Sequence, residues 1–309
     1  MKALVFGSLN IDYVYRVPHF VERGETLASS SFQRFCGGKG LNQAIALSRA
    51  GMQTWMAGAV GEEGGFLLEE LRKAGVNTDC VARSDAATGH AIIQNSMDGD
   101  NCILLFGGAN RCIGRAQIRE VLAAFGPGDL LLVQNEINLL EEIVRQAKDR
   151  GMLVALNPSP MEKDVILPLL PYADILIVNR IEAEQLCGVQ AAEPDVLLRE
   201  LGGMCSAKEI VLTLGEEGSL LWLDGALIRQ SALPVHAVDT TGAGDSFTGF
   251  FLTGLLLNKD PVFALHYAAA AAALAVTRAG AAASIPKREE VLRFMDENEQ
   301  PHRKELPPI

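Results

Sequence analysis

The chain has 309 residues, of which 49% are hydrophobic, so it can bury a sizeable core as one large domain or two ordinary ones. Its formal net charge of −11 at pH 7 argues against nucleic acid or an anionic membrane as the main partner, although a local pocket can still bind an anion. The six cysteines form no CxxC pair and no zinc-like spacing, which favours reduced thiols in a cytosolic protein. The N-terminal stretch MKALVFGSLN lacks the features of a signal peptide, and no apolar run is long enough to span a bilayer, so we expect a cytoplasmic location.

Short apolar runs alternate along the chain with amphipathic stretches of helical period. The runs have the length and branching of buried strands: KALVFG (2–7), DLLLVQ (129–134), LVALNP (153–158), DILIVN (174–179) and EIVLTLG (209–215). The helical stretches end on glycine, the expected stop: LNQAIALSRAG (41–51), GGFLLEELRKAG (64–75), NLLEEIVRQAKDRG (138–151) and IEAEQLCG (181–188). This alternation predicts an α/β fold with a mainly parallel sheet, whose strands are continuously hydrophobic because both faces are covered.

Two segments break this rhythm. Residues 12–35, beginning DYVYRVPHF, alternate apolar and polar side chains and include Pro18. Residues 89–108, GHAIIQNSMDGDNCILLFGG, are typical of a hairpin with DGDN as its turn. Both have the pattern of half-exposed antiparallel strands, and we expect them to form a small separate sheet.

The stretch VDTTGAGDSFTGF (238–250) has the composition of a ligand-binding turn. We expect residues 233–238 to form a strand and the apolar stretch after Asp245 to form a helix, which places TTGAGD at a strand-to-helix turn. Gly242 and Gly244 would leave the N–H groups at the helix start open to an anion. The alternative is that Asp245 only caps the helix. The stretch has no lysine and not the spacing of a P-loop.

Two motifs nearer the N-terminus offer further polar groups. In CGGKGLNQA (36–44), paired glycines precede a helix, and Lys39 and Asn42 bring a cation and an amide to its start. The alternative is a glycine-rich turn with a solvated lysine. In GSLNIDY, Asn10 and Asp12 occupy alternate positions and so lie on one side of the chain, where an amide and a carboxylate suit vicinal sugar hydroxyls. An Asx turn is the alternative.

Two later motifs are weak in isolation. Asn179 and Glu182 follow a predicted strand, and Glu182 has an alternative role in stabilising the start of the next helix. TLGEEGS (213–219) is equally typical of a tight turn between strands.

Together, and in this order, these five motifs resemble the PfkB carbohydrate kinase family, and within it the ribokinases most of all. GGKGLNQA and DTTGAGDSFTG are similar to the two signature regions of the family, and the resemblance runs from GSLNID to VTRAGAAASIP near residue 286. It implies a ribokinase-like three-layer α/β/α sandwich with a mainly parallel central sheet and a small β-sheet lid. By this resemblance, residues 1–11, 35–87 and 108–309 form the nucleotide- and sugar-binding domain, and residues 12–34 and 88–107 form the lid.

The resemblance also implies an activity and a role for individual residues. The activity is ATP-dependent phosphorylation of a sugar, most closely D-ribose at its 5-hydroxyl, with Asp245 as catalytic base and the amides of Gly242, Ala243 and Gly244 as an anion hole. The expected sugar contacts are Asn10, Asp12, Gly38, Lys39, Asn42 and Glu136. The expected nucleotide contacts are Asn179, Thr213, Gly215, Gly218 and Gly244. Glu182 matches a residue that organises Mg²⁺ through water, and the expected loop for a monovalent cation, K⁺, comprises Asp239, Thr241, Ala275, Arg278, Gly280 and Ser284.

A few positions depart from the family pattern without removing a catalytic group. Ala269 stands where ribokinases often have a polar residue near the adenine, which leaves the base selectivity open. Arg180 and Ile181 replace a more usual polar pair between Asn179 and Glu182. Glu63 replaces a common aspartate.

Other functions are weighed against this one. The second candidate is a PfkB kinase for another acceptor, such as 2-deoxyribose, a ketohexose or a nucleoside, although Asn10 and Asp12 favour an acceptor with vicinal hydroxyls. A non-catalytic sugar-binding regulator would be expected to lack Asp245 or the glycines beside it, and both are present. A dinucleotide oxidoreductase is disfavoured because no GxGxxG follows the first strand. Among macromolecular partners we expect only a second copy, in a homodimer through the lid, which the apolar positions of DYVYRV would permit.

Overall fold

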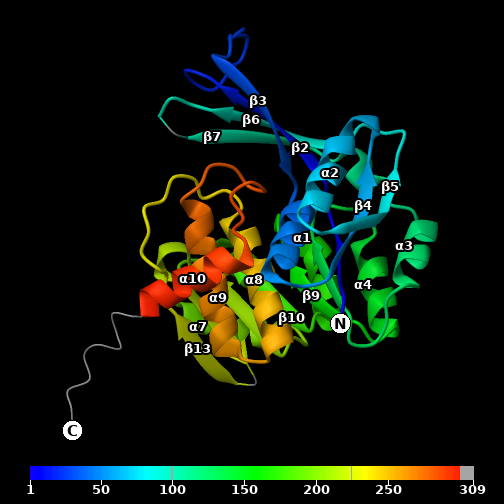
Figure 1. The fold of residues 1–309 in the computed structure, drawn as a ribbon, viewed down its shortest axis with the longest axis vertical. Helices are drawn as coiled ribbons and strands as arrows, with labels where there is room; N and C mark the ends of the chain where they lie inside the picture. The colour runs from blue at the N-terminus through cyan, green and yellow to red at the C-terminus, as the bar shows by residue number, and fades with distance from the viewer. Residues whose placement is uncertain (99, 224, 300–309) are drawn as a thin grey trace.

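A computed structural model describes residues 1–98, 100–223 and 225–299, and within them a large sheet forms the centre of the molecule (Figure 1). Its nine strands lie in the order β13-β12-β11-β10-β9-β8-β1-β4-β5. Their bounds are β1 Ala3–Phe6, β4 Thr54–Val60, β5 Asn77–Arg83, β8 Leu130–Gln134, β9 Leu153–Asn157, β10 Ile175–Asn179, β11 Glu209–Thr213, β12 Ser219–Leu223 and β13 Ala226–Gln230. All neighbouring pairs from β5 to β11 are parallel, and β12 and β13 continue the sheet in antiparallel pairing.

Helices cover both faces of this sheet because its buried strands point alternate side chains to opposite sides. On β1, Ala3 and Val5 pack into one hydrophobic core, and Leu4 and Phe6 pack into another. The first core includes side chains of α1 Lys39–Ala50, α2 Gly65–Lys73, α8 Ala243–Asn258, α9 Pro261–Val276 and α10 Arg288–Glu299. The second includes side chains of α3 Arg115–Leu122, α4 Leu140–Asp149, α5 Lys163–Ile166, α6 Arg180–Cys187 and α7 Pro194–Met204. The predicted three-layer α/β/α fold is therefore confirmed.

A second sheet of four strands extends from the main body at the top of Figure 1. Its order is β3-β2-β6-β7, with bounds β2 Asn10–Arg16, β3 Ser31–Gly37, β6 Gly89–Asn95 and β7 Asn101–Phe106. The two segments that break the helical rhythm do meet in one small sheet, and the predicted hairpin is the antiparallel pair β6 and β7. The predicted turn includes Gly99, which lies outside the described residues.

One predicted strand is wrong. Residues 233–238 form no strand in the described part of the chain, where the last strand of the sheet, β13, ends before them at Gln230. Pro234 lacks the N–H group that a sheet ladder needs. The N–H groups of Val238 and Asp239 instead donate to the carbonyl of Val276, at 2.7 and 3.1 Å. The segment therefore joins the sheet to α8 along the end of α9.

The small-residue stretch near residue 270 forms the buried helix α9, as its composition predicts, packed against α8. Among the described residues, no helix is both long and apolar enough to cross a membrane.

Candidate active site

The carboxylate of Asp245 lies at the start of α8 and is 7% exposed. Gly242, at φ 76°, is the N-cap of α8, three residues before Asp245, so Asp245 lies in the first turn and not at the cap position. Its Oδ2 accepts a hydrogen bond from Nδ2 of Asn42, and its Oδ1 accepts one from Nε2 of Gln43, both at 2.9 Å. The carboxylate therefore contacts α1 rather than capping its own helix.

The helices α1 and α8 touch at Gly249, one turn after Asp245. A Cβ atom at this position would lie 2.4 Å from Cβ of Ala46 and 2.6 Å from the backbone nitrogen of Leu47. Only a residue without a side chain allows this approach, and the approach brings Asn42 within reach of Asp245.

The residues expected to contact a sugar lie at the start of β2, at the start of α1 and just after β8. Glu136 accepts hydrogen bonds from the Ser8 hydroxyl and, at 3.0 Å, from the Lys39 backbone nitrogen. Asn10 is buried and accepts a hydrogen bond at 2.7 Å from Nδ2 of Asn110. Burial, and then the negative charge of Glu136, raise the pKa of Asp12 to about 7. These carboxylates therefore interact within one site.

Lys39 carries the positive charge between these groups. Burial alone would lower the pKa of its ammonium, but the charges of Asp245, Glu136 and Glu182 together raise it above its ordinary value. The lysine is thus a stable cation that interacts with all three carboxylates. Beside it, Oδ1 of Asn42 is buried without a hydrogen-bond partner in the described part of the chain, and it is free to accept a bond from a ligand.

A hollow of about 590 Å³ adjoins the start of α8 and is the best candidate for a nucleotide site. Of the predicted nucleotide residues, it is lined by Thr213, Gly215, Gly218 and Gly244. Its walls are largely apolar and include Leu233, Val235, Phe247, Ala269, Ala272 and Val276. An apolar hollow with few polar groups is typical of a site for a flat base. Ala269 is the position that the resemblance places near the adenine, whereas the other wall residues of α9 and of residues 233–238 carry no polar signal in the sequence.

Asn179 lies outside the lining of that hollow and forms a capping box with Glu182. Its side chain accepts a hydrogen bond from the Glu182 nitrogen at 2.8 Å, and the Glu182 carboxylate accepts one from the Asn179 nitrogen at 3.0 Å. The alternative role of Glu182 in starting α6 is therefore confirmed. It is compatible with a second role, since Glu182 is near enough to affect the pKa of Lys39.

The loop expected to bind a monovalent cation joins two segments. Asp239 accepts hydrogen bonds from the backbone nitrogens of Thr241, at 2.9 Å, and Gly280, at 2.8 Å. Burial opposes ionisation of Asp239, but these bonds lower its pKa overall. Ser284 is buried and its hydroxyl donates to the carbonyl of Ala281. The Arg278 nitrogen donates to the Ala275 carbonyl at 3.1 Å, and the Arg278 side chain pairs with Glu290.

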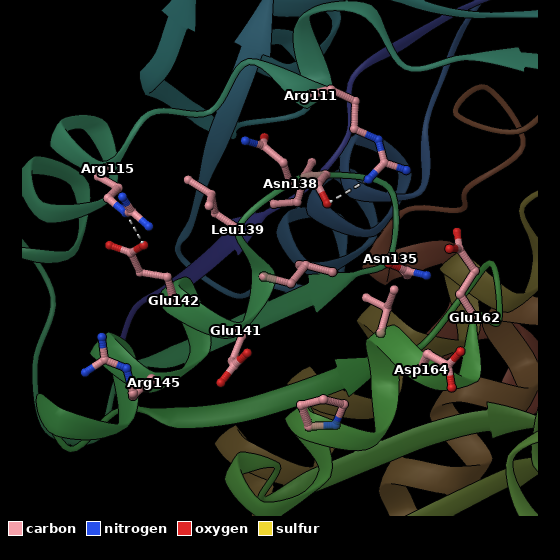
Figure 2. Close-up of a pocket in the computed structure, with 14 residues that line it drawn as sticks. Arg111, Arg115, Asn135, Asn138, Leu139, Glu141, Glu142, Arg145, Glu162 and Asp164 are labelled. Atoms are coloured by element: carbon pink, nitrogen blue, oxygen red, sulfur yellow. Dashed lines mark hydrogen bonds and ion pairs between the residues drawn. The ribbon is translucent and has the colours of Figure 1, made fainter.

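A second hollow, of about 510 Å³, is lined in part by the loop that follows β8 (Figure 2). Asn135 and Ile137 line it on either side of Glu136, but none of the predicted site residues does. Its cations already have partners, because Arg115 pairs with Glu142 at 2.8 Å and Arg111 donates to the Ile137 carbonyl at 3.2 Å.

The sequence motifs also missed buried polar residues that hold the site together. Asn110 contacts Asn10, and Gln134 and Asn157 contact Gln43. Gln43 lies within the GGKGLNQA motif, yet its neighbours come from β8 and β9, where a single polar residue ending an apolar run is the only sequence signal.

The raised pKa of Asp12 predicts that sugar affinity depends on pH. Because a carboxylate accepts stronger hydrogen bonds than a carboxylic acid, KM for the sugar should fall as pH rises through 7. It should be roughly tenfold higher at pH 6 than at pH 8. Initial rates from pH 6 to 8 in the wild type and Asp12→Asn would measure this. A wild-type KM that is flat over this range would contradict it, whereas Asp12→Asn should be flat.

The raised pKa of Asp12 also makes the stability of the folded protein depend on pH. A carboxyl whose pKa is raised on folding stabilises the folded state below its unfolded pKa of 3.8, and this contribution is lost as pH rises through 7. Asp12→Asn should therefore raise the melting temperature of the sugar-free protein at pH 8 more than at pH 5.

Comparisons with known proteins find similar chains over most of this sequence. The family model of pfkB family carbohydrate kinases matches residues 1–288. The ribokinase of Haemophilus influenzae is 35% identical over 301 residues, covering 94% of this chain and 97% of its own. The ribokinase of Arabidopsis thaliana, solved with ribose and ATP, aligns with a TM-score of 0.85 at 32% identity over 95% of this chain and 98% of its own. The ribokinase of Cryptococcus neoformans, solved with ADP, aligns with a TM-score of 0.82 at 34% identity over 94% of this chain and 98% of its own.

Proposed function

The chain belongs to the PfkB carbohydrate kinase family and is a sugar kinase, and we propose that it transfers phosphate from ATP to the 5-hydroxyl of D-ribose. The observation that carries the proposal is the buried carboxylate of Asp245, held by two amides beside the apolar hollow at the start of α8. The relatives named as ribokinases, one of them solved with ribose and ATP, support the choice of sugar and nucleotide.

In the proposed reaction, Asp245 accepts the proton of the sugar hydroxyl. The hydroxyl oxygen bonds to the γ-phosphorus, the bond from that phosphorus to the β,γ-bridging oxygen breaks, and ADP leaves. Little covalent work falls to the protein, because phosphoryl transfer depends on positioning and on stabilising charge on the phosphoryl oxygens. The N–H groups of Gly242, Ala243 and Gly244 at the start of α8 would bind those oxygens, assisted by the helix dipole.

The proposed sugar site uses the groups around Lys39. Asn10, Asp12 and Glu136 offer hydrogen-bond acceptors. Lys39 supplies a cation that can donate hydrogen bonds, and Oδ1 of Asn42 supplies a further acceptor. A sugar with vicinal hydroxyls needs both donors and acceptors. Gly38, the N-cap of α1, would contact the same ring.

ATP would bind with its base in the apolar hollow and its phosphates toward Ala243 and Gly244. Thr213, Gly215 and Gly218 would contact the base and ribose, and Asn179 the phosphates. Among the described residues there is no group of three or more His, Cys, Asp or Glu side chains that could hold a metal. Mg²⁺ would therefore be bound mainly by ATP itself, with Glu182 reaching it through water. Its chemistry there is to neutralise phosphate charge.

A monovalent cation, K⁺, fits the loops joined by Asp239. Carbonyl, hydroxyl and carboxylate oxygens of Asp239, Thr241, Ala275, Arg278, Gly280 and Ser284 are the hard donors that such a cation needs. A bound cation would fix the segment that leads to Gly242. Gly242 lies close to the same loop, since a Cβ atom added to it would be 3.0 Å from Cα of Ala281.

This proposal predicts activation by potassium. We expect kcat to be severalfold higher in KCl than in LiCl at equal ionic strength, because Li⁺ is too small for a loop of carbonyl oxygens. Steady-state rates with saturating ATP, Mg²⁺ and sugar measure the effect. Equal kcat in the two salts would refute the cation site and leave the kinase assignment intact.

The substrate is tested with a panel of acceptors. Measured by ADP release, kcat/KM should be higher for D-ribose than for 2-deoxyribose, ketohexoses or nucleosides. The product from D-ribose should be the 5-phosphate. A higher kcat/KM for another acceptor would establish the second candidate, a PfkB kinase for that acceptor. Binding of sugar without ADP release for any acceptor would indicate the non-catalytic regulator.

We further propose that residues 12–34 and 88–107 act as a lid and pair in a homodimer. Strand β7 is exposed over its whole length, and Ile103, Leu104, Leu105 and Phe106 are 53–67% exposed, which is unusual for a large apolar cluster. A lid would exclude water, which competes with the sugar as acceptor.

The homodimer is a separate prediction. Sedimentation at micromolar concentration should give a dimer, and Leu104→Asp should give a monomer because it places a charge on the strand face. Val262→Asp, at an equally exposed apolar residue of α9, is the matched control and should stay dimeric. A wild-type monomer would refute the interface.

A further inference from the structure

Gln43 makes the second hydrogen bond to Asp245, and its own amide is held by two other buried side chains. We propose that Gln43 is a positioning residue for Asp245 and that Gln134 and Asn157 fix its orientation. This inference rests on the proposed function, since it gives Asp245 the role of the base. It adds Gln134 and Asn157, two buried residues outside the proposed sugar and nucleotide contacts.

The contacts form a chain through the interior. Nε2 of Gln43 donates to Oδ1 of Asp245 at 2.9 Å and to Oδ1 of Asn157 at 2.8 Å. Oε1 of Gln43 accepts from Nε2 of Gln134 at 2.6 Å. Nδ2 of Asn157 donates to the carbonyl of Ile177 at 3.0 Å.

The two ends of this chain decide which way every amide faces. The Asp245 carboxylate and the Ile177 carbonyl can only accept hydrogen bonds. Asn157 must therefore turn its NH₂ group to Ile177 and its oxygen to Gln43. If Gln43 were reversed, its oxygen would face two other acceptors and its NH₂ group would face that of Gln134.

Burial makes this orientation costly to lose. Gln43 and Gln134 are 0% exposed, and Asn157 is 9% exposed, so water has little access to replace a missing partner. The three residues also come from separate elements: the second turn of α1 and the last residues of β8 and β9. Gln134 packs so closely on the main chain after β1 that a Cβ on Gly7 would lie 2.2 Å from its Oε1. The position of the Asp245 carboxylate is thereby coupled to the central sheet.

The consequence for the reaction is one of geometry. Each carboxylate oxygen can accept two hydrogen bonds. The bonds from Asn42 and Gln43 use one on each oxygen and leave the other for the sugar hydroxyl. With Gln43 removed, the carboxylate is free to rotate about its terminal torsion, which is soft. A misplaced reacting group lowers the rate of the chemical step more than the binding of either substrate.

The test uses the full chain and three methionine variants. Gln43→Met keeps the length of the side chain, and we expect kcat to fall by roughly 10- to 100-fold with KM for sugar and ATP within about twofold of the wild type. Gln134→Met should lower kcat less. Because Gln134 acts only through Gln43, the double variant should be no slower than Gln43→Met alone. Gln117→Met is the matched control: Gln117 donates to the Gly58 carbonyl at 2.7 Å on the other face of the sheet, and its loss should lower the melting temperature with kcat unchanged.

The outcomes separate this inference from the function on which it rests. An unchanged kcat in Gln43→Met, or effects of Gln43 and Gln134 that multiply in the double variant, would overturn the positioning role. If Asp245→Asn keeps its turnover, the base assignment itself fails. Should Gln43→Met not fold, Gln43→Leu is also neutral and of similar size and removes the donor to Asp245 without adding a charge, and it should show the same loss of kcat with KM unchanged.

Discussion

Asp245→Asn is expected to lower kcat by about 10²- to 10⁴-fold while KM for the sugar changes little. The substitution keeps the size of the side chain and removes its ability to accept the proton of the sugar hydroxyl. The new amide can still accept one of the two hydrogen bonds that Asn42 and Gln43 donate, at 2.9 Å in the wild type. The other donor then faces an NH₂ group, so a modest fall in the melting temperature is expected beside the large fall in rate.

Single-turnover rates and a melting curve together measure these two effects. Asp260→Asn is the matched control, because Asp260 caps α9 through the backbone nitrogens of Val262 and Phe263 and is remote from the site. Asparagine is as good an N-cap as aspartate, so both rate and stability should be unchanged. Near-normal turnover in Asp245→Asn would rule out Asp245 as the base.

The central strands could be predicted from the sequence because burial on both faces leaves a signal in every residue. The runs that begin at Ala3, Leu130, Leu153, Ile175 and Glu209 all became parallel strands of one sheet. The hairpin of β6 and β7 could be predicted because its turn residues are local. Both signals depend only on the chain near each element.

Other elements depend on neighbours far away in the chain. Strands β12 and β13 follow β11 as an antiparallel extension. Strand β12 is buried over residues 219–221, whereas β13 is largely exposed and its apolar pattern is weaker than that of the buried strands. Residues 233–238 have the composition of a strand but form none among the described residues, and the N–H group of Val238 donates to the Val276 carbonyl. Composition reports a preference for extended backbone, whereas a strand also needs a partner.

The candidate site shows the same division. Asp245 and the glycines before it form a local motif, and that motif raises two alternatives, a helix cap and a functional carboxylate. The distances to Asn42 and Gln43, about two hundred positions away along the chain, decide that the carboxylate is not a cap. For Asn179 and Glu182, by contrast, the structure retains the capping role and adds an electrostatic one through Lys39. A local motif therefore identifies candidate site residues, and contacts between segments far apart in the chain decide which role each residue has.

Gly249→Ala is expected to destabilise the protein by about 3 kcal/mol and to lower kcat as well. The added methyl group would meet Cβ of Ala46 at 2.4 Å and the backbone nitrogen of Leu47 at 2.6 Å. Backbone atoms of α1 cannot rotate aside as a flexible side chain would, so the two helices must separate. The same helices carry the donors and the acceptor of the bonds to Asp245, one turn away, and these bonds should lengthen.

A fall in melting temperature of roughly 5 °C would correspond to that free energy in a chain of this length. We expect kcat to fall about tenfold, with KM for ATP unchanged because the apolar hollow lies on the far side of α8 from α1. Gly203→Ala is the control: it makes the same substitution within a helix, at a position where a new Cβ meets no atom within 4 Å. Alanine is the better helix former, so this variant should be neutral or slightly more stable, with full activity. If Gly249→Ala loses stability and keeps kcat, the close packing of α1 on α8 serves folding alone, and the bonds to Asp245 tolerate a wider separation.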